Sequence, residues 1–355
     1  MNFTFSEDQL LLQQTVREFL AGECSIAWVR EQWDSASGRS PEFWQKLTEI
    51  GIPGLLISEA QGGLEMDEID FVLLLEETGR AALTEPVIAT ALVAARVFQE
   101  LNSAALQSEW LPRIASGDAL IATGSPVNPF VADAHIADLI LLPGADAIRL
   151  LAPDDVSLTP LASNDPSRRI FSLAWDDSKA RVVAQGEAAR QICAAALDRG
   201  AMACAAQALG VCDQLIEMSV SYASQRKQFG VPIGSFQAVK HMLANVKVEL
   251  EYARSLVYRA AHSVAHASDA RGIDVSMAKV AACEAAVNAA KVSLQVHGAI
   301  GYTWEQDLHV WMRRAWSLDL AWGDRAFHRS RVTAGIIEGS SAATPFGYSA
   351  PGGLA

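Results

Sequence analysis

The chain of 355 residues exceeds the usual size of a single hydrophobic core, so its length predicts two or three structural units. Half of the residues are hydrophobic and 19% are charged, which is typical of a globular protein, and no apolar run approaches the roughly 18 residues that would span a bilayer. The net charge of −13, with basic residues scattered among acidic ones, disfavours nucleic acid as a partner, although an anionic cofactor needs only a few well-placed cations.

Residues 1–118 are predicted to form an N-terminal helical domain. They begin without a basic or apolar leader segment, so we expect a cytoplasmic protein. The chain's five cysteines are odd in number and scattered, so we expect neither a disulfide framework nor a metal site. Ser6 and Gln9 have the spacing of a capping box. Further helices are expected over about 41–50 and 67–82, with more helix to about residue 117, and glycine-rich breaks at 51–54 and 61–63 separate them.

Residues 119–186 are predicted to form a small, shortened β domain. Apolar runs at 137–143 and 147–151 are expected to be strands joined by a turn at 144–146, and 169–175 fits another strand. Residues 187–339 are predicted to form a C-terminal four-helix bundle, and 340–355, rich in Ser, Ala, Gly and Pro, a flexible tail. The fold class is therefore mainly α, with a truncated β-sheet domain between two helical domains.

One bundle helix carries the clearest periodicity. Apolar residues recur every three or four positions over three heptads, at Phe236, Val239, Leu243, Val246, Leu250, Ala253 and Val257. Such a row is the seam of a packed helix. Alanine-rich stretches near 201–208 and 280–290 permit close approach between helices.

Two motifs in this region resemble segments of the acyl-CoA dehydrogenase family. Arg226-Lys227-Gln228-Phe229-Gly230 resembles the family's R-x-Q-F-G segment, and the match continues through 231–241. Residues 295–305 resemble its Q-x-x-G-G-x-G-Y segment, with Ala299 in place of the second Gly, and 307–309 and 313–315 continue that match. The segments 51–55 and 61–64 also fit, so the resemblance covers nearly the whole chain. One motif alone would be weak evidence, but two long motifs in the right order are specific.

The resemblance implies FAD as the cofactor, largely the FAD of a neighbouring subunit. The residues that would contact it are Arg226, Gln228 and Phe229 around the pyrophosphate, and Gln237, Gln295 and Gly298 on the adenosine side. A guanidinium between a helix and a turn can bind a pyrophosphate with two hydrogen bonds, and glycine lets the backbone approach a nucleotide closely. Taken alone, Arg226 would be a surface salt-bridge partner, Gly298 a helix terminator and Gln237 a solvated or capping residue. The joint motif favours cofactor contact.

The chain departs from the family at the catalytic base. An acyl-CoA dehydrogenase removes the α-proton with a carboxylate while a hydride leaves Cβ for the flavin, and this carboxylate is usually the Glu of a Y-E-G-T segment. Trp322 takes that position here, and an indole cannot accept the proton. The family's other base position falls near Gly200, which carries no carboxylate, and Asp198 is misplaced by two residues. We therefore assign no catalytic residue to this chain.

Two further departures affect the same half of the site. Asp324 replaces the Thr that normally hydrogen-bonds the flavin dinucleotide, and an anion beside a pyrophosphate is unfavourable unless a cation such as Arg325 pairs with it. Only 122–126 remains of the family's T-E-P-x-x-G-S-D segment. The lost residues belong to the half-site that a subunit builds for its own FAD, and the retained residues belong to the half donated to a neighbour.

This pattern resembles the shortened subunit of heteromeric, α2β2 acyl-CoA dehydrogenases of bacterial steroid side-chain β-oxidation. The resemblance implies a companion subunit that supplies the base, the acyl pocket and the sheet. It also implies an acyl-CoA substrate, with a steroid side-chain CoA ester as a guess by analogy, and an electron-transfer flavoprotein as the electron acceptor. Two alternatives stay open: a homomeric acyl-CoA dehydrogenase with a relocated base, and a non-catalytic scaffolding or binding protein of the same fold.

Other acids and one histidine have two interpretations each. Glu284 and Glu249 are candidates for a relocated base. Glu284 would otherwise be a buried acid paired with a bundle Arg or Lys, whereas Glu249 and Glu251 would be solvated or in helix pairs. His297 would either reach a ribose or phosphate or be a loop histidine without a role.

Overall fold

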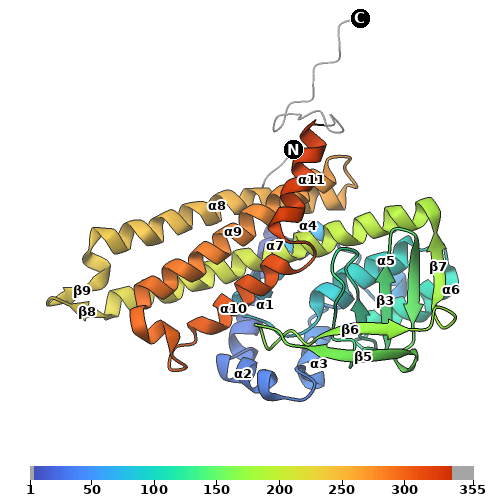
Figure 1. Cartoon of the computed structure of the whole chain (residues 1–355), viewed down its shortest axis with the longest axis horizontal. Coiled ribbons are helices and arrows are strands. Elements are labelled where there is room, and N and C mark those ends of the chain that lie inside the picture. The colour runs from blue at the N-terminus through green and yellow to red at the C-terminus, as the bar shows by residue number, and fades with distance from the viewer. Residues whose placement is uncertain (1–3, 338–355) are drawn as a thin grey trace, which may run out of the picture.

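The computed structural model describes residues 4–337, in which a helical region, a region of strands and a second helical region follow one another (Figure 1). The protein is mainly helical, as predicted, and the small sheet region lies between the two sets of helices. The predicted tail at 340–355 lies outside the described residues. No helix within 4–337 is both long and apolar enough to cross a membrane.

The N-terminal region is helical from Glu7 to Ala115, with short turns between its elements. The predicted capping box is present, because the Ser6 side chain accepts from the backbone of Gln9 while the Gln9 side chain accepts from the backbone of Ser6. The elements are α1 (Glu7–Glu23), α2 (Ile26–Asp34), α3 (Pro41–Glu49), η1 (Glu59–Gln61), α4 (Glu68–Arg80), η2 (Ile88–Ala94), α5 (Ala95–Glu100) and α6 (Ala104–Ala115).

The strand region contains two small sheets. The first has the order β1 (Ile121–Thr123), β3 (Leu139–Pro143), β4 (Ala147–Leu151), β7 (Arg181–Gln185), and the second has the order β2 (Val131–Ala132), β6 (Ile170–Trp175), β5 (Val156–Leu161). Only β1 and β3 pair in parallel; the other neighbours are antiparallel. The strand region thus has the three predicted strands, β3, β4 and β6, and four strands that were not predicted.

The C-terminal region is built on long helices that start where β7 ends. They are α7 (Gly186–Gln225), α8 (Gln237–Ala265), α9 (Arg271–His297), α10 (Leu308–Leu320) and α11 (Arg325–Ile337). A two-stranded hairpin, β8 (Lys227–Gln228) and β9 (Val231–Pro232), joins α7 to α8 through η4 (Ile233–Ser235), and η5 (Gly298–Tyr302) follows α9. Figure 1 shows this hairpin at one end of the bundle, whereas the two sheets lie along the opposite part of α7.

Glycines let α4 and α7 come into backbone contact. A Cβ added to Gly79 would lie 2.1 Å from the carbonyl oxygen of Gln207, and one added to Gly210 would lie 1.9 Å from that of Glu76. No larger residue fits at either position without separating the helices. The alanine-rich segment of α7 is buried at the same place, so this contact joins the N-terminal region firmly to the bundle.

The predicted seam of α8 is buried over only part of its length. Val246, Leu250, Ala253 and Val257 are at most 1% exposed, but Phe236 is 38% exposed. Val239 and Leu243 are only half-buried. The prediction of a packed seam is therefore wrong at the N-terminal end of the row, because that end extends with the hairpin beyond the neighbouring helices of the same chain.

Candidate cofactor-binding site

The hairpin after α7 presents Arg226 and Phe229 to the outside. Arg226 caps the C-terminus of α7, and its carbonyl accepts from the Ile233 amide (2.8 Å), which closes the hairpin. At the tip, Phe229 and Gly230 have φ of 53° and 83°, as a tight hairpin turn with two left-handed residues requires. Glycine adopts this conformation freely, whereas Phe229 does so at a cost of about 1 kcal/mol while its side chain remains 93% exposed. Nothing in the chain's own core explains that side chain.

Arg226 has no partner among residues 4–337. Its side chain is exposed and makes neither a hydrogen bond nor an ion pair there. The alternative interpretation of Arg226 as a surface salt-bridge residue is therefore not supported, since no acid of the described residues pairs with it. A guanidinium held at the end of a helix without a counter-charge is suited to binding an anion.

The other predicted contact residues lie at the same end of the bundle. Gln237 is the first residue of α8, and Gln295 is exposed in the last turn of α9. Gly298 ends α9 with φ of 66°, so the helix-terminator interpretation is also correct, but a Cβ there would meet nothing within 4 Å. The Tyr222 and His297 rings stack at 4.4 Å between centroids, which places the ends of α7 and α9 side by side.

These residues fit an anionic dinucleotide such as FAD. The 29-residue helix α8 begins without a side-chain cap, so its positive dipole end is available to a phosphate. Arg226 adds a full positive charge, and the open backbone at Gly298 permits close approach of a nucleotide. His297, by contrast, is buried at the end of α9, and its Nδ1 lies 2.8 Å from the Ser293 carbonyl oxygen. Its position supports a packing role.

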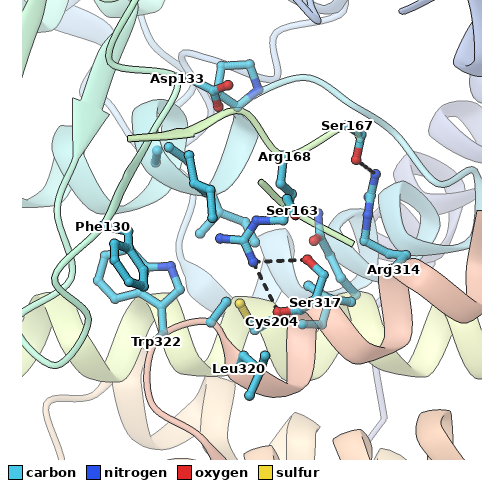
Figure 2. Close-up of a pocket in the computed structure, with 18 of the residues that line it drawn as sticks. Phe130, Asp133, Ser163, Ser167, Arg168, Cys204, Arg314, Ser317, Leu320 and Trp322 are labelled. Atoms are coloured by element: carbon cyan, nitrogen blue, oxygen red, sulfur yellow. Dashed lines mark hydrogen bonds between the residues drawn. The ribbon is translucent and has the colours of Figure 1, made fainter. Parts of the chain in front are cut away.

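A separate cavity lies between the strand region and the bundle (Figure 2). Its volume is about 420 Å³, and its lining includes the residues that sequence analysis assigned to the chain's own half-site, such as Thr123, Ser125 and Trp322. Arg168 reaches into this cavity from the loop before β6 and donates to Ser317 on α10.

Trp322 and Gly200, where the sequence resemblance predicts the two alternative base positions, touch one another. A Cβ added to Gly200 would lie only 2.1 Å from Cδ2 of the indole, so the ring occupies the space beside α7 that either carboxylate would have needed. Trp322 is 7% exposed and has φ of 56°, and His328 holds its carbonyl through Nε2 (2.9 Å). Desolvation lowers the pKa of His328 to about 4, so it is neutral at pH 7.

The acids near these positions have structural partners. Asp198 is buried between Arg271 and Arg331, at 2.8 Å from each. Asp324 caps α11 by accepting from the Phe327 amide (2.8 Å). Arg325 does not pair with Asp324 but with Asp319 on α10, at 2.8 Å.

The candidates for a relocated base are also partnered. Glu284 pairs with Arg329 as predicted, but its side chain is 45% exposed, so the expectation of a buried acid is wrong. Because the pair lies at the edge of the bundle, solvent reaches it. Glu249 accepts from Asn288, and Glu251 pairs with Lys247 one helical turn away.

Three residues of the cavity, Arg168, Thr84 and Glu85, were not predicted from the sequence. Arg168 and Arg169 are adjacent in a loop, and only the structure shows that Arg168 faces the cavity while Arg169 binds two backbone carbonyls of the N-terminal region. Thr84 and Glu85 line the cavity from the segment that follows α4, and burial raises the pKa of Glu85 to about 7. The only sequence signal was a threonine and an acid in an otherwise apolar stretch.

Residues 4–337 contain no cluster of side chains suited to a metal ion.

Comparisons with known proteins identify the relatives. Residues 6–118 match the family model for the acyl-CoA dehydrogenase N-terminal domain, and residues 190–337 match that for the C-terminal domain. Acyl-CoA dehydrogenase IpdE2 of Mycobacterium tuberculosis is 32% identical over 87% of this chain and 91% of its own length. Acyl-CoA dehydrogenase FadE34 of the same organism is 30% identical over 93% of this chain, but over only 48% of its own length.

Two solved structures share the fold over almost their whole length. The Tcur3481–Tcur3483 steroid ACAD G363A variant has a TM-score of 0.84 at 25% identity, covering 94% of this chain and 99% of that one. A chain of the ChsE4–ChsE5 complex from Mycobacterium tuberculosis has a TM-score of 0.83 at 25% identity, covering 95% and 99%. FAD is the cofactor of this group of proteins. The chain belongs to the acyl-CoA dehydrogenase family and resembles its shortened, heteromeric type.

Proposed function

We propose that this chain is the shortened subunit of a heteromeric, FAD-dependent acyl-CoA dehydrogenase, and that it holds part of the FAD of a companion subunit. The placement of Arg226 carries the proposal. Cys204 on α7 lines the chain's own cavity, and Arg226 follows 22 residues later at the end of the same helix. At 1.5 Å per residue, that separation is about 33 Å along the helix axis. An arginine side chain cannot bridge it, so Arg226 serves a cofactor bound mainly by another chain.

This chain's part in the reaction is binding and orientation. Arg226 would donate two hydrogen bonds to the pyrophosphate, assisted by the N-terminus of α8, while Gln228 and Phe229 flank it. Gln237, Gln295 and the open backbone of Gly298 would line the adenosine side. When bound, FAD supplies the hydride acceptor for α,β-desaturation of an acyl-CoA thioester. The companion supplies the base, since Trp322 fills both positions from which this chain could have offered one.

The relatives agree with such an assembly. Two structures of similar fold carry paired names in their descriptions, and one of them is described as a complex. FadE34 is about twice as long as the part this chain matches, as expected if two such units are joined in one polypeptide. By analogy with the steroid ACAD, a steroid CoA ester is proposed as the substrate. The side-chain ester, the α2β2 assembly and an electron-transfer flavoprotein as the acceptor are proposed from the family resemblance.

Co-expression with a candidate companion acyl-CoA dehydrogenase subunit tests the proposal. The mass and the FAD stoichiometry are measured for the lone chain and for the complex. We expect FAD and acyl-CoA oxidation only in the complex. A lone chain that binds FAD stoichiometrically and oxidises acyl-CoA would overturn the proposal, whereas a complex without flavin would favour the scaffolding alternative.

A substitution in the hairpin tests the role of Arg226 directly. Arg226→Met in the complex should weaken FAD binding by about 10- to 100-fold, the range expected for losing a charge-assisted hydrogen bond. The melting temperature of the lone chain should not change, because the side chain has no partner there. Arg190→Met is the matched control, since Arg190 is an exposed arginine near the other end of α7. Equal FAD affinity in both variants would contradict the assignment.

One observation favours the homomeric alternative. Glu85 lines the chain's own cavity, and burial raises its pKa to about 7, which suits a general base. Its Oε1 already accepts from the Ser40 amide (3.1 Å). Under this alternative, a purified homomer would contain FAD, and Glu85→Gln would abolish its turnover without releasing the flavin. Glu284 and Glu249 are partnered at the edge of the bundle and receive no such support.

A further inference from the structure

Arg168 is a cation without a counter-charge inside the cavity between the strand region and α10 (Figure 2). Its Nη1 donates to the carbonyl and to the hydroxyl of Ser317, at 3.1 and 3.2 Å. The two other arginines that line the cavity are neutralised, Arg314 by Asp165 and Arg39 by Asp133, each at 2.6 Å. No carboxylate of residues 4–337 forms such a pair with Arg168, so its remaining donors face the cavity unmatched.

A second group in the same cavity also lacks an acceptor. The hydroxyl of Thr84 is buried, with the residue 4% exposed, and has no hydrogen-bond partner in the described structure. Buried polar groups are almost always paired. A guanidinium can only donate, and a hydroxyl can donate. An acceptor would satisfy Thr84, and an anionic acceptor would also supply the counter-charge that Arg168 lacks.

Part of the remaining lining is apolar, beside polar side chains that include Glu85, Asn128 and Gln207. Phe130, Trp316, Leu320 and Trp322 contribute to the apolar part, and the first three are between 38% and 62% exposed, so an apolar surface reaches the outside of the chain. The volume of about 420 Å³ lies within the range of small-molecule sites. One unpaired cation beside this apolar surface suits a ligand with one negative charge and a hydrophobic body.

We propose that this cavity binds an amphipathic monocarboxylate, with the carboxylate on Arg168 and Thr84 and the hydrophobic body against Phe130 and Trp322. A carboxylate matches the planar guanidinium with two parallel hydrogen bonds. A dinucleotide carries at least two charges on its phosphates, for which the cavity offers one unpaired cation. The inference goes beyond the proposed function and rests on one part of it, namely that the chain's own cavity does not hold FAD.

Calorimetric titration of the complex with 2-naphthoate and with its neutral analogue 2-naphthamide tests the proposal. We expect naphthoate to bind at least ten-fold more tightly than the amide. Arg168→Met should remove that difference, and Arg168→Lys should retain part of it. Thr84→Val, which keeps the shape but removes the unpaired hydroxyl, should weaken naphthoate binding several-fold without lowering stability.

Arg190→Met is again the control, and it should bind naphthoate as the wild type does. Equal affinity for the acid and the amide, or naphthoate binding that survives Arg168→Met, would overturn the proposal. Titration of the lone chain with FAD separates the two hypotheses. FAD binding that Arg168→Met weakens would make the cavity a flavin site and would refute the proposed function as well, whereas absence of naphthoate binding refutes only this inference.

Discussion

Replacing Gly200 by alanine tests whether the indole of Trp322 fills the place of the missing base. The new Cβ would lie 2.1, 2.4 and 2.5 Å from three atoms of the indole, so the ring must retreat by more than 1 Å to reach an ordinary contact of about 3.4 Å. It has little freedom to do so, because it is 7% exposed and His328 holds its backbone. Overpacking of this kind costs about 1–3 kcal/mol. Alanine instead of glycine within a helix returns up to about 1 kcal/mol, so we expect Gly200→Ala to lower the free energy of unfolding by up to about 2 kcal/mol.

Denaturant unfolding of four proteins isolates this contact. In a Trp322→Ala background the clash is absent, so Gly200→Ala should there raise the free energy of unfolding by up to about 1 kcal/mol. The two substitutions are thus coupled by about 1–3 kcal/mol. If Gly200→Ala has the same effect in both backgrounds, the indole does not lie against α7, and Trp322 does not fill the space beside Gly200.

Three other predictions concern stability and are checked by denaturant unfolding. Desolvation lowers the pKa of buried His328 to about 4, against about 6.5 when unfolded, so its contribution is complete above pH 6.5 and is lost as the pH falls toward 4. Between pH 7 and pH 5 the free energy of unfolding of the wild type should therefore fall by about 2 kcal/mol relative to that of His328→Gln, a difference from which the opposite contribution of Glu85 cancels. Gly210→Ala, which drives a Cβ against the backbone of α4, should cost about 3 kcal/mol, whereas Gly22→Ala in α1, where a Cβ meets nothing, should stabilise by up to about 1 kcal/mol. Lys279→Met, which leaves two carbonyls at the C-terminal end of α10 without their buried donor, should cost about 1–3 kcal/mol, and Lys291→Met on the surface less than about 0.5 kcal/mol. Equal costs for either matched pair, or the same pH dependence after His328→Gln, would contradict the structure.

Local chemistry explains which elements could be predicted. The capping box at Ser6 and the turn at 144–146 depend on neighbouring residues alone, so the sequence is sufficient for both. The strand β5 was missed because Pro160 within it argues against a strand, and β7 because its apolar run is only three residues long, between Arg181 and Gln185. Both lie at the edges of their sheets, where such residues are tolerated.

Periodicity alone could not say what the apolar row of α8 contacts. A row that packs on the chain's own helices and a row that packs on another chain have the same spacing, so Phe236 was expected in the core and is exposed. The motif residues around Arg226 could be located from sequence, because a helix end and a turn are local features. The contact between Gly200 and Trp322, and the choice of Arg168 over Arg169 as the cavity arginine, depend on tertiary packing.

The hairpin between β8 and β9 contributes almost nothing to the chain's own core, since Phe229 at its tip is 93% exposed and Arg226 has no partner in the described residues. A chain with a damaged hairpin would therefore still fold. Under the proposed function, such a chain in a complex would leave the FAD site of an intact companion subunit incomplete. In a cell that makes both versions of this chain, the damaged one would act as a dominant-negative inhibitor, and the loss of activity would follow its share of the assemblies.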